Sequence, residues 1–149
     1  MGMWTVPQLE SYLHREIPLA AAMEIRVADL DPHHIRLTAP LAANRNPHET
    51  AFGGSLATLA VVTGWALLHV NLVDAFPTAE LVISSHEVDY IKPVQADFSA
   101  ECDLAESDLA GFLAALPESR SAEIELSGVM GEQGHVASRF RSRFHATMT

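Results

Sequence analysis

Residues 51–73 read AFGGSLATLAVVTGWALLHVNLV and contain no Asp, Glu, Lys or Arg. As a helix this run would be about 35 Å long, enough to cross a bilayer, so either lipid or protein must shield it from water. Polar residues such as Ser55, Thr63, His69 and Asn71 dilute its apolar character, and no Lys/Arg cluster flanks it to orient a membrane insertion. We therefore predict a buried helix wrapped by a sheet.

The segments on both sides of this helix alternate apolar and polar residues, the pattern of strands with one buried and one wet face. Upstream, the alternation predicts strands over residues 23–28 and 35–39, joined by a turn at 31–33. Downstream, it predicts strands over residues 81–91, 98–104, 122–127 and 136–144. Six strands and one long helix after the second strand indicate a single α+β domain over residues 1–149.

Two shorter helices are predicted from capping residues and prolines. The first opens at Thr5, where the sequence TVPQ fits a capping box, and ends at Pro18. The second spans residues 108–116, with Ser107 as its N-cap and Pro117 as its end.

The composition excludes several classes of protein. With 48% hydrophobic and 19% charged residues, the chain is globular rather than disordered. A net charge of −10 argues against nucleic-acid binding, which needs a basic surface. The single cysteine, Cys102, excludes an intrachain disulfide, alternates with apolar residues as a core position does, and fits a reducing compartment. The N-terminus has no signal-peptide pattern, so we expect a cytoplasmic protein.

Two longer motifs carry a family resemblance. The first is APLAANRNPHETAFGGSL over residues 39–56, and the second is SHEVDYIKPV over residues 85–94. With the order of the predicted elements, they make the chain resemble the thioesterase-like family typified by the C-terminal domain of the YiiD protein. The resemblance covers essentially the whole chain and implies the hotdog fold, a curved antiparallel sheet of about six strands wrapped around one long apolar helix.

The resemblance also implies a function. Family members act on acyl groups carried as thioesters by coenzyme A or acyl carrier protein, and some are malonyl-carrier decarboxylases rather than hydrolases. Members usually dimerise with active sites at the subunit interface, so a homodimer or a dimer of dimers is expected. No cofactor is implied, and the 8 histidines show no metal-ligand spacing, so no metal is predicted. Neither nucleic acid nor a membrane is an expected partner.

The sequence departs from the pattern of related thioesterases at the central helix. Wider hotdog thioesterases often carry His-Gly-Gly at the helix start and an Asp or Glu further along it, whereas this chain has Phe52 and Val61 at those positions. No carboxylate occurs between Glu49 and Asp74. A helix carboxylate is therefore not available to activate water.

Amide groups are the alternative source of catalysis. The Gly53-Gly54 pair places backbone N–H groups at the helix N-terminus, and Asn44 and Asn46 lie just upstream. An Asn side chain and a backbone N–H together make an oxyanion hole, so Asn46, Asn44 and Gly54 are candidate catalytic residues. The same Asn residues could instead hold turns, and the glycines could serve close helix–sheet packing.

His48 is a further candidate catalytic residue, because with Glu49 it could form a base and its orienting group, although loop residues of this kind are often simply solvated. His86 lies on a predicted strand, on the same face as Ser84, and is expected to be satisfied by a neighbouring side chain. The expected substrate-binding residues belong to the helix-start motif or are nearby cations: Thr50, Phe52, Gly53, Ser55, Arg45 and Lys92.

Arg139, Arg141 and Arg143 share one face of the last predicted strand. They could contact the phosphates of coenzyme A or an acidic carrier protein, or they could form an ordinary solvated face. The sequence leaves both interpretations open.

Three functions fit these observations. The first is hydrolysis of acyl thioesters, with His48, Glu49 or a residue of a partner subunit as the base. The second is decarboxylation of a malonyl thioester, which needs no base to start and only amide donors to stabilise the enolate. The third is non-catalytic binding of acyl carriers, which needs the same pocket without turnover.

Overall fold

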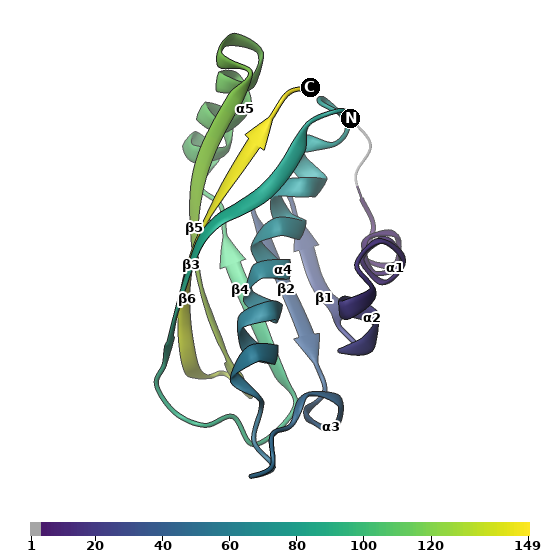
Figure 1. The fold of residues 1–149 in the computed structure, drawn as a ribbon, viewed down its shortest axis with the longest axis vertical. Coiled ribbons are helices and arrows are strands. Elements are labelled where there is room, and N and C mark those ends of the chain that lie inside the picture. The colour runs from purple at the N-terminus through teal and green to yellow at the C-terminus, as the bar shows by residue number, and fades with distance from the viewer. Residues whose placement is uncertain (1–3) are drawn as a thin grey trace.

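The long apolar helix α4 (Gly53–Leu72) lies across the inner face of a six-stranded antiparallel sheet in the computed structural model, which describes residues 4–149 (Figure 1). The strand order is β1-β2-β4-β5-β6-β3, so β1 and β3 are the edges. The sheet curves around the helix, and the predicted α+β arrangement is confirmed. The strands are β1 (Arg26–Asp31), β2 (His34–Ala39), β3 (Glu80–Tyr90), β4 (Phe98–Asp103), β5 (Ser121–Glu132) and β6 (His135–Thr147).

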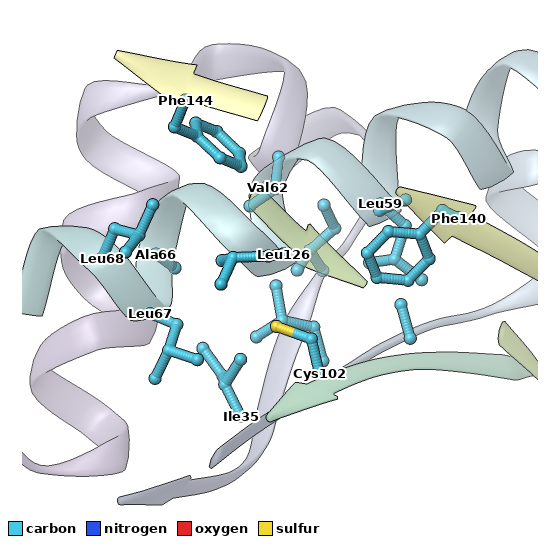
Figure 2. Close-up of a cluster of buried hydrophobic side chains, with 14 of the residues drawn as sticks. Ile35, Leu59, Val62, Ala66, Leu67, Leu68, Cys102, Leu126, Phe140 and Phe144 are labelled. Atoms are coloured by element: carbon cyan, nitrogen blue, oxygen red, sulfur yellow. The ribbon is translucent and has the colours of Figure 1, made fainter. Parts of the chain in front are cut away.

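The hydrophobic core forms where α4 meets the sheet. By length and composition α4 could span a membrane, but 61% of its most apolar window is buried inside the protein, as expected of a core helix. Gly64 allows close packing, since a Cβ there would lie 2.9 Å from Phe144 Cε2. Figure 2 shows side chains of α4 interleaved with those of the strands, among them Leu59, Val62, Leu67, Leu126, Phe140 and the buried Cys102.

Shorter helices flank this core: α1 (Val6–Glu16), α2 (Pro18–Ala22), α3 (Leu41–Asn44) and α5 (Glu106–Ser119). In Figure 1, α1 and α2 lie beside α4 on the β1 side of the sheet, and α5 packs on β5. The predicted capping box of α1 is confirmed, because Gln8 N donates to Thr5 Oγ1 at 3.2 Å and Thr5 N donates to Gln8 Oε1 at 2.9 Å.

The predicted start of the first strand is wrong. Glu24 has a φ of 58°, in the left-handed region, so the extended backbone of β1 begins only at Arg26. The preceding residues form α2, because Pro18 not only ends α1 but also fits the first turn of a second helix. The predicted alternation of burial still holds at Met23, Ile25 and Val27, which are all buried.

Both predicted ends of α5 are also wrong. The helix follows Ala105 rather than Ser107, and no side chain caps it. Pro117 lies inside the helix, which continues to Ser119. The fixed φ of proline is itself helical, so near a C-terminus proline removes one backbone donor without ending the helix.

A cluster of aromatic rings docks α1 onto α4. The His69 ring stacks against Tyr12 at 4.6 Å and against Trp65 at 4.7 Å, measured between ring centroids, and Trp4 meets it edge-on at 5.5 Å. Tyr12 and Trp65 are themselves 6.4 Å apart. The side chain is buried, and its Nε2 has no hydrogen-bond partner among residues 4–149. Burial lowers the pKa of His69, and the negative charge of Asp74 opposes this shift only partly. Docking of α1 against this ring therefore favours the neutral imidazole.

This cluster predicts a loss of stability in acid. Because the pKa of folded His69 lies below its ordinary 6.5, the unfolded chain takes up the proton first as the pH falls through that value. We expect the melting temperature to fall between about pH 7.5 and about pH 5.5, and less so in His69→Phe, which keeps a ring in the stack but does not titrate. His135→Gln, at the exposed first residue of β6, is the control. Equal falls in the wild type and in His69→Phe would contradict the prediction.

Candidate active site

The N-terminus of α4 offers backbone N–H groups that no described residue accepts. Phe52, the N-cap residue, makes no side-chain cap hydrogen bond, and the first bond into the helix runs from Leu56 N to Phe52 O at 3.1 Å. The amides of Gly53, Gly54 and Ser55 therefore have no partner within residues 4–149. Their partial positive charges suit an anion or a developing oxyanion.

Hydrogen bonds from neighbouring segments fix this helix end in place. Ala51 N donates to Val94 O at 2.8 Å, which pairs the loop before α4 with the segment after β3. The Tyr90 hydroxyl donates to Gly53 O at 2.8 Å and ties the end of β3 to the first helical turn. Contacts with the end of β3 and with the segment that follows it thus fix the position of the three open amides.

Two exposed aromatic rings border the glycine pair. A Cβ on Gly54 would lie 2.4 Å from Phe52 Cε2, and a Cβ on Gly53 would lie 3.6 Å from the Tyr90 hydroxyl oxygen. Phe52 and Tyr90 are 56% and 53% exposed. The missing side chain of Gly54 therefore allows the Phe52 ring to lie against the first turn of the helix, whereas the Tyr90 ring lies at an ordinary contact distance from Gly53. The two rings flank the open amides.

The Asn46 side chain organises the turn before α4. Its Oδ1 accepts from His48 N at 2.8 Å and from Thr50 N at 3.2 Å, and its Nδ2 donates to Thr50 Oγ1 at 2.8 Å. Asn46 is therefore a turn residue, the alternative that the sequence left open. One N–H of its amide has no acceptor in the part of the chain that the structure describes, so a role in an oxyanion hole stays a prediction.

The Asn44 side chain is 3% exposed and holds the loop to the N-terminal segment. Its Nδ2 donates to Met23 O at 2.9 Å and to Pro40 O at 2.8 Å, and its backbone carbonyl accepts from Phe52 N at 2.7 Å. Both amide N–H groups are thus engaged, and in this conformation Asn44 has no donor left for a substrate oxygen.

The other predicted site residues surround the same helix end without converging on one atom. His48 and Glu49 are both exposed, and within the described chain they form no ion pair with each other. Arg45 and Lys92 are exposed on the two loops that meet at the Ala51–Val94 bond. Thr50, Gly53 and Ser55 are half-buried.

One face of α4 near this end is only partly covered. Ala57, Thr58 and Val61 are half-buried and Gly54 is exposed, and their spacing of three and four residues puts them on one side of the helix. Between residues 53 and 72 no carboxylate faces this gap, because the helix contains none. Val61, at the position where related thioesterases carry Asp or Glu, lies on this partly open face.

His86 on β3 lies beside this face of α4. Its Nδ1 is 2.9 Å from Ser142 Oγ on β6, so the predicted neighbour exists. Burial lowers the pKa of His86, and the backbone of Ala57 partly offsets the shift. Ser84, which was predicted to share a face with His86, lies instead at a bulge in β3, where it is exposed and donates to Arg143 O.

The arginines of β6 lie on the outer face of the sheet, away from α4. Arg141 forms ion pairs with Glu87 and, at 3.6 Å, with Glu125, and Arg143 lies 3.8 Å from Glu125. Arg139 and Arg141 border an outer groove of about 550 Å³ that is also lined by acidic residues. The geometry favours a solvated, ion-paired face over a phosphate site.

A family model described as "Putative thioesterase (yiiD_Cterm)" matches residues 6–148. The chain belongs to this family. Membership in the YiiD C-terminal family supports a thioesterase-like function.

Solved structures share the fold of this family member. A protein of unknown function from Chlorobaculum tepidum TLS is 23% identical with a TM-score of 0.88, covering 97% of this chain and 94% of that chain. A "putative thioesterase" from Shewanella oneidensis is 22% identical with a TM-score of 0.83 and covers 97% of each chain. A "Probable Thioesterase" from Pseudomonas aeruginosa is 21% identical with a TM-score of 0.86, covering 99% of this chain and 100% of that chain. The shared fold is the hotdog fold.

A substitution at Asn46 separates its two roles in this YiiD C-terminal family protein. Asn46→Asp keeps an acceptor for the His48 and Thr50 amides but removes the N–H donors. If the remaining N–H stabilises an oxyanion, turnover of an acyl thioester falls by about 10²–10³ while the melting temperature is kept. If Asn46 only holds the turn, Asn46→Asp stays active, and Asn46→Ala lowers the melting temperature with activity falling in proportion.

Proposed function

We propose that the protein acts on acyl thioesters of coenzyme A or acyl carrier protein, with hydrolysis as the reaction. The observation that carries this proposal is the set of open amides at Gly53, Gly54 and Ser55, bordered by exposed aromatic rings. A thioester carbonyl placed there accepts hydrogen bonds that strengthen as its oxygen becomes negative. Each such donor contributes about 10²–10³ in rate.

Hydrolysis also needs a base for the attacking water. His48 and Glu49 are the titratable side chains on the loop that leads into α4, and both are exposed to solvent. A water deprotonated by one of them attacks the thioester carbon, the tetrahedral oxyanion forms at the amides, and the thiolate leaves as the carbonyl re-forms. A group from a second subunit is the other source of a base.

Decarboxylation of a malonyl thioester is the second candidate, favoured by the absence of any carboxylate on α4. In this reaction the bond between the carboxylate carbon and C2 breaks, and carbon dioxide leaves. The bonding electrons form an enolate whose oxygen lies at the same amides. Protonation of C2 then gives an acetyl thioester, so no base is needed to begin the reaction.

The coenzyme A or carrier-protein part of the substrate would lie on the solvent-exposed side of the α4 N-terminus. Arg45 and Lys92 lie on the two loops that border it, and each is exposed without an ion pair among the described residues. Two cations suit the phosphates of coenzyme A or the acidic surface of a carrier protein.

The single buried thiol of Cys102, whose pKa burial raises to about 12, fits a cytoplasmic location.

Product analysis tests the proposed function. The purified protein is incubated with acetyl-, malonyl- and long-chain acyl thioesters of coenzyme A and of acyl carrier protein, and products are identified by mass spectrometry. Free acid together with free thiol supports hydrolysis, and acetyl thioester formed from malonyl thioester supports decarboxylation. Binding without any product would leave a non-catalytic acyl-carrier binder and contradict both enzyme proposals.

We further propose that two copies pair along β3. This edge strand has 11 residues, and Val82, Tyr90 and Ile91 on or next to it are 56%, 53% and 56% exposed. A long open edge with apolar side chains favours pairing with a second sheet edge. Such a dimer covers the open face of α4 and places the two sites at the interface.

A charge on the edge strand tests this dimer. Val82→Lys should raise the dimer dissociation constant by roughly tenfold or more, because a buried lysine opposes pairing of strand edges. Leu19→Lys is the matched control, since Leu19 on α2 is 53% exposed but lies far from β3 in the sheet order. Analytical ultracentrifugation measures both variants. A wild-type protein that is monomeric at micromolar concentration would exclude the dimer.

A further inference from the structure

His86 is a polar side chain among apolar inward-facing residues of β3. The inward-facing residues of β3 before Tyr90 are Leu81, Ile83, His86 and Val88, and all four are only half-buried within the described chain. Their counterparts on β6, such as Phe140 and Phe144, are fully buried. The inner face of β3 is therefore incompletely covered where it runs beside the open face of α4.

The position of His86 relative to the open amides follows from three contacts between β3 and α4. Tyr90 binds Gly53 O at the start of the helix, His86 lies beside the backbone of Ala57, and Trp65 Nε1 donates to Leu81 O at 3.0 Å further along. Ala57 follows Gly54 by about one helical turn, or about 4.5 Å along the axis. Along the axis of α4, His86 thus lies about one helical turn beyond the position proposed for the thioester carbonyl.

One polar atom of His86 has no hydrogen-bond partner among residues 4–149. This atom is Nε2, which is buried, although the backbone of Ala57 lies close enough to influence the pKa of the ring. Buried polar groups are usually paired, so Nε2 indicates a place for a polar group that is not part of the described chain. A ligand oxygen between β3 and α4 would supply the missing partner.

The chemistry of His86 makes it a neutral donor. The lowered pKa keeps the imidazole uncharged at neutral pH. When the Ser142 hydroxyl donates to Nδ1, the proton of the ring is on Nε2, which then donates. Nε2 is covered by protein atoms, so the half-exposed ring would have to rotate for a ligand oxygen to reach it.

We propose that His86 is a specificity-determining residue that selects acyl groups bearing an oxygen on C3, the carbon two bonds from the thioester carbon. This inference rests on the proposed acyl-thioester function. With ordinary bond lengths, an oxygen on C3 lies about 3–5 Å from the thioester oxygen. This span is comparable to the rise of about 4.5 Å from Gly54 to Ala57, whose backbone lies beside His86. Both 3-hydroxyacyl and malonyl groups carry such an oxygen, whereas a saturated acyl group leaves Nε2 unpaired.

The test compares substrates that differ at C3. Values of kcat/KM are measured for 3-hydroxybutyryl-, malonyl- and butyryl-coenzyme A. Calorimetry measures the binding of the corresponding analogues in which a methylene replaces the sulfur. We expect the wild type to prefer at least one oxygen-bearing group over butyryl, and His86→Leu to reduce that preference by about tenfold. His86→Gln, which keeps an N–H donor, should retain part of it.

Ser85→Ala is the control, because Ser85 is exposed on the same strand and should keep the wild-type preference. Which of the two oxygen-bearing groups depends on His86 identifies the source of the oxygen. A preference that is absent in the wild type, or unchanged in His86→Leu, overturns the inference. Equal losses for all substrates with a lowered melting temperature would also overturn it, because they indicate a structural role.

Binding and turnover together separate this inference from the proposed function. Analogues that bind with a His86-dependent preference, while no thioester is consumed, support the role of His86 and refute the enzyme proposal. Turnover without any His86-dependent preference supports the enzyme proposal and refutes the role of His86. If no analogue binds and no thioester is consumed, both are refuted.

Discussion

A helix without charged side chains has to be kept from water, and most of the structure follows from this constraint. The sheet curves around the 20 residues of α4, and α1 and α2 cover one flank. Cover is thinnest beside the edge strand β3, where Ala57 and Val61 stay half-buried. The open amides of Gly53 and Gly54 lie at the end of the same gap. The candidate site is thus placed where the shielding of the helix is incomplete.

The burial of α4 also explains why this helix contains no carboxylate. An ionised side chain inside this core would be costly without a partner, and α4 contains no Asp, Glu, Lys or Arg. On α4 itself, the groups left to stabilise a negative charge are dipoles, which need no proton and can be held rigidly. Backbone amides fixed by Tyr90 and Val94 meet that requirement.

The fold could be predicted where burial alone decides it. Strands β2, β4 and β6 alternate buried and exposed residues as their sequences do, and α4 is the longest apolar run. Prediction failed where a single backbone conformation decides, as at Glu24 with its left-handed φ and at Pro117 within α5. Hydrophobic periodicity carries no signal for either.

The candidate site could be located from the sequence, but its contacts could not. The motif around Asn46 marked the loop before α4. The bond between the Asn46 and Thr50 side chains spans only four residues, so a turn-holding role was one of the two interpretations that the sequence offered for Asn46. The partners of Asn44 and His86 lie far away in the chain, at Met23 and Ser142, and no local pattern encodes them.

The strand order has a further consequence, since β6 separates β3 from β5 and pairs Thr147 with Glu80. During synthesis β3 has no strand to pair with until β6 has left the ribosome, so the nascent chain exposes an apolar helix and an open strand, the kind of surface that chaperones bind.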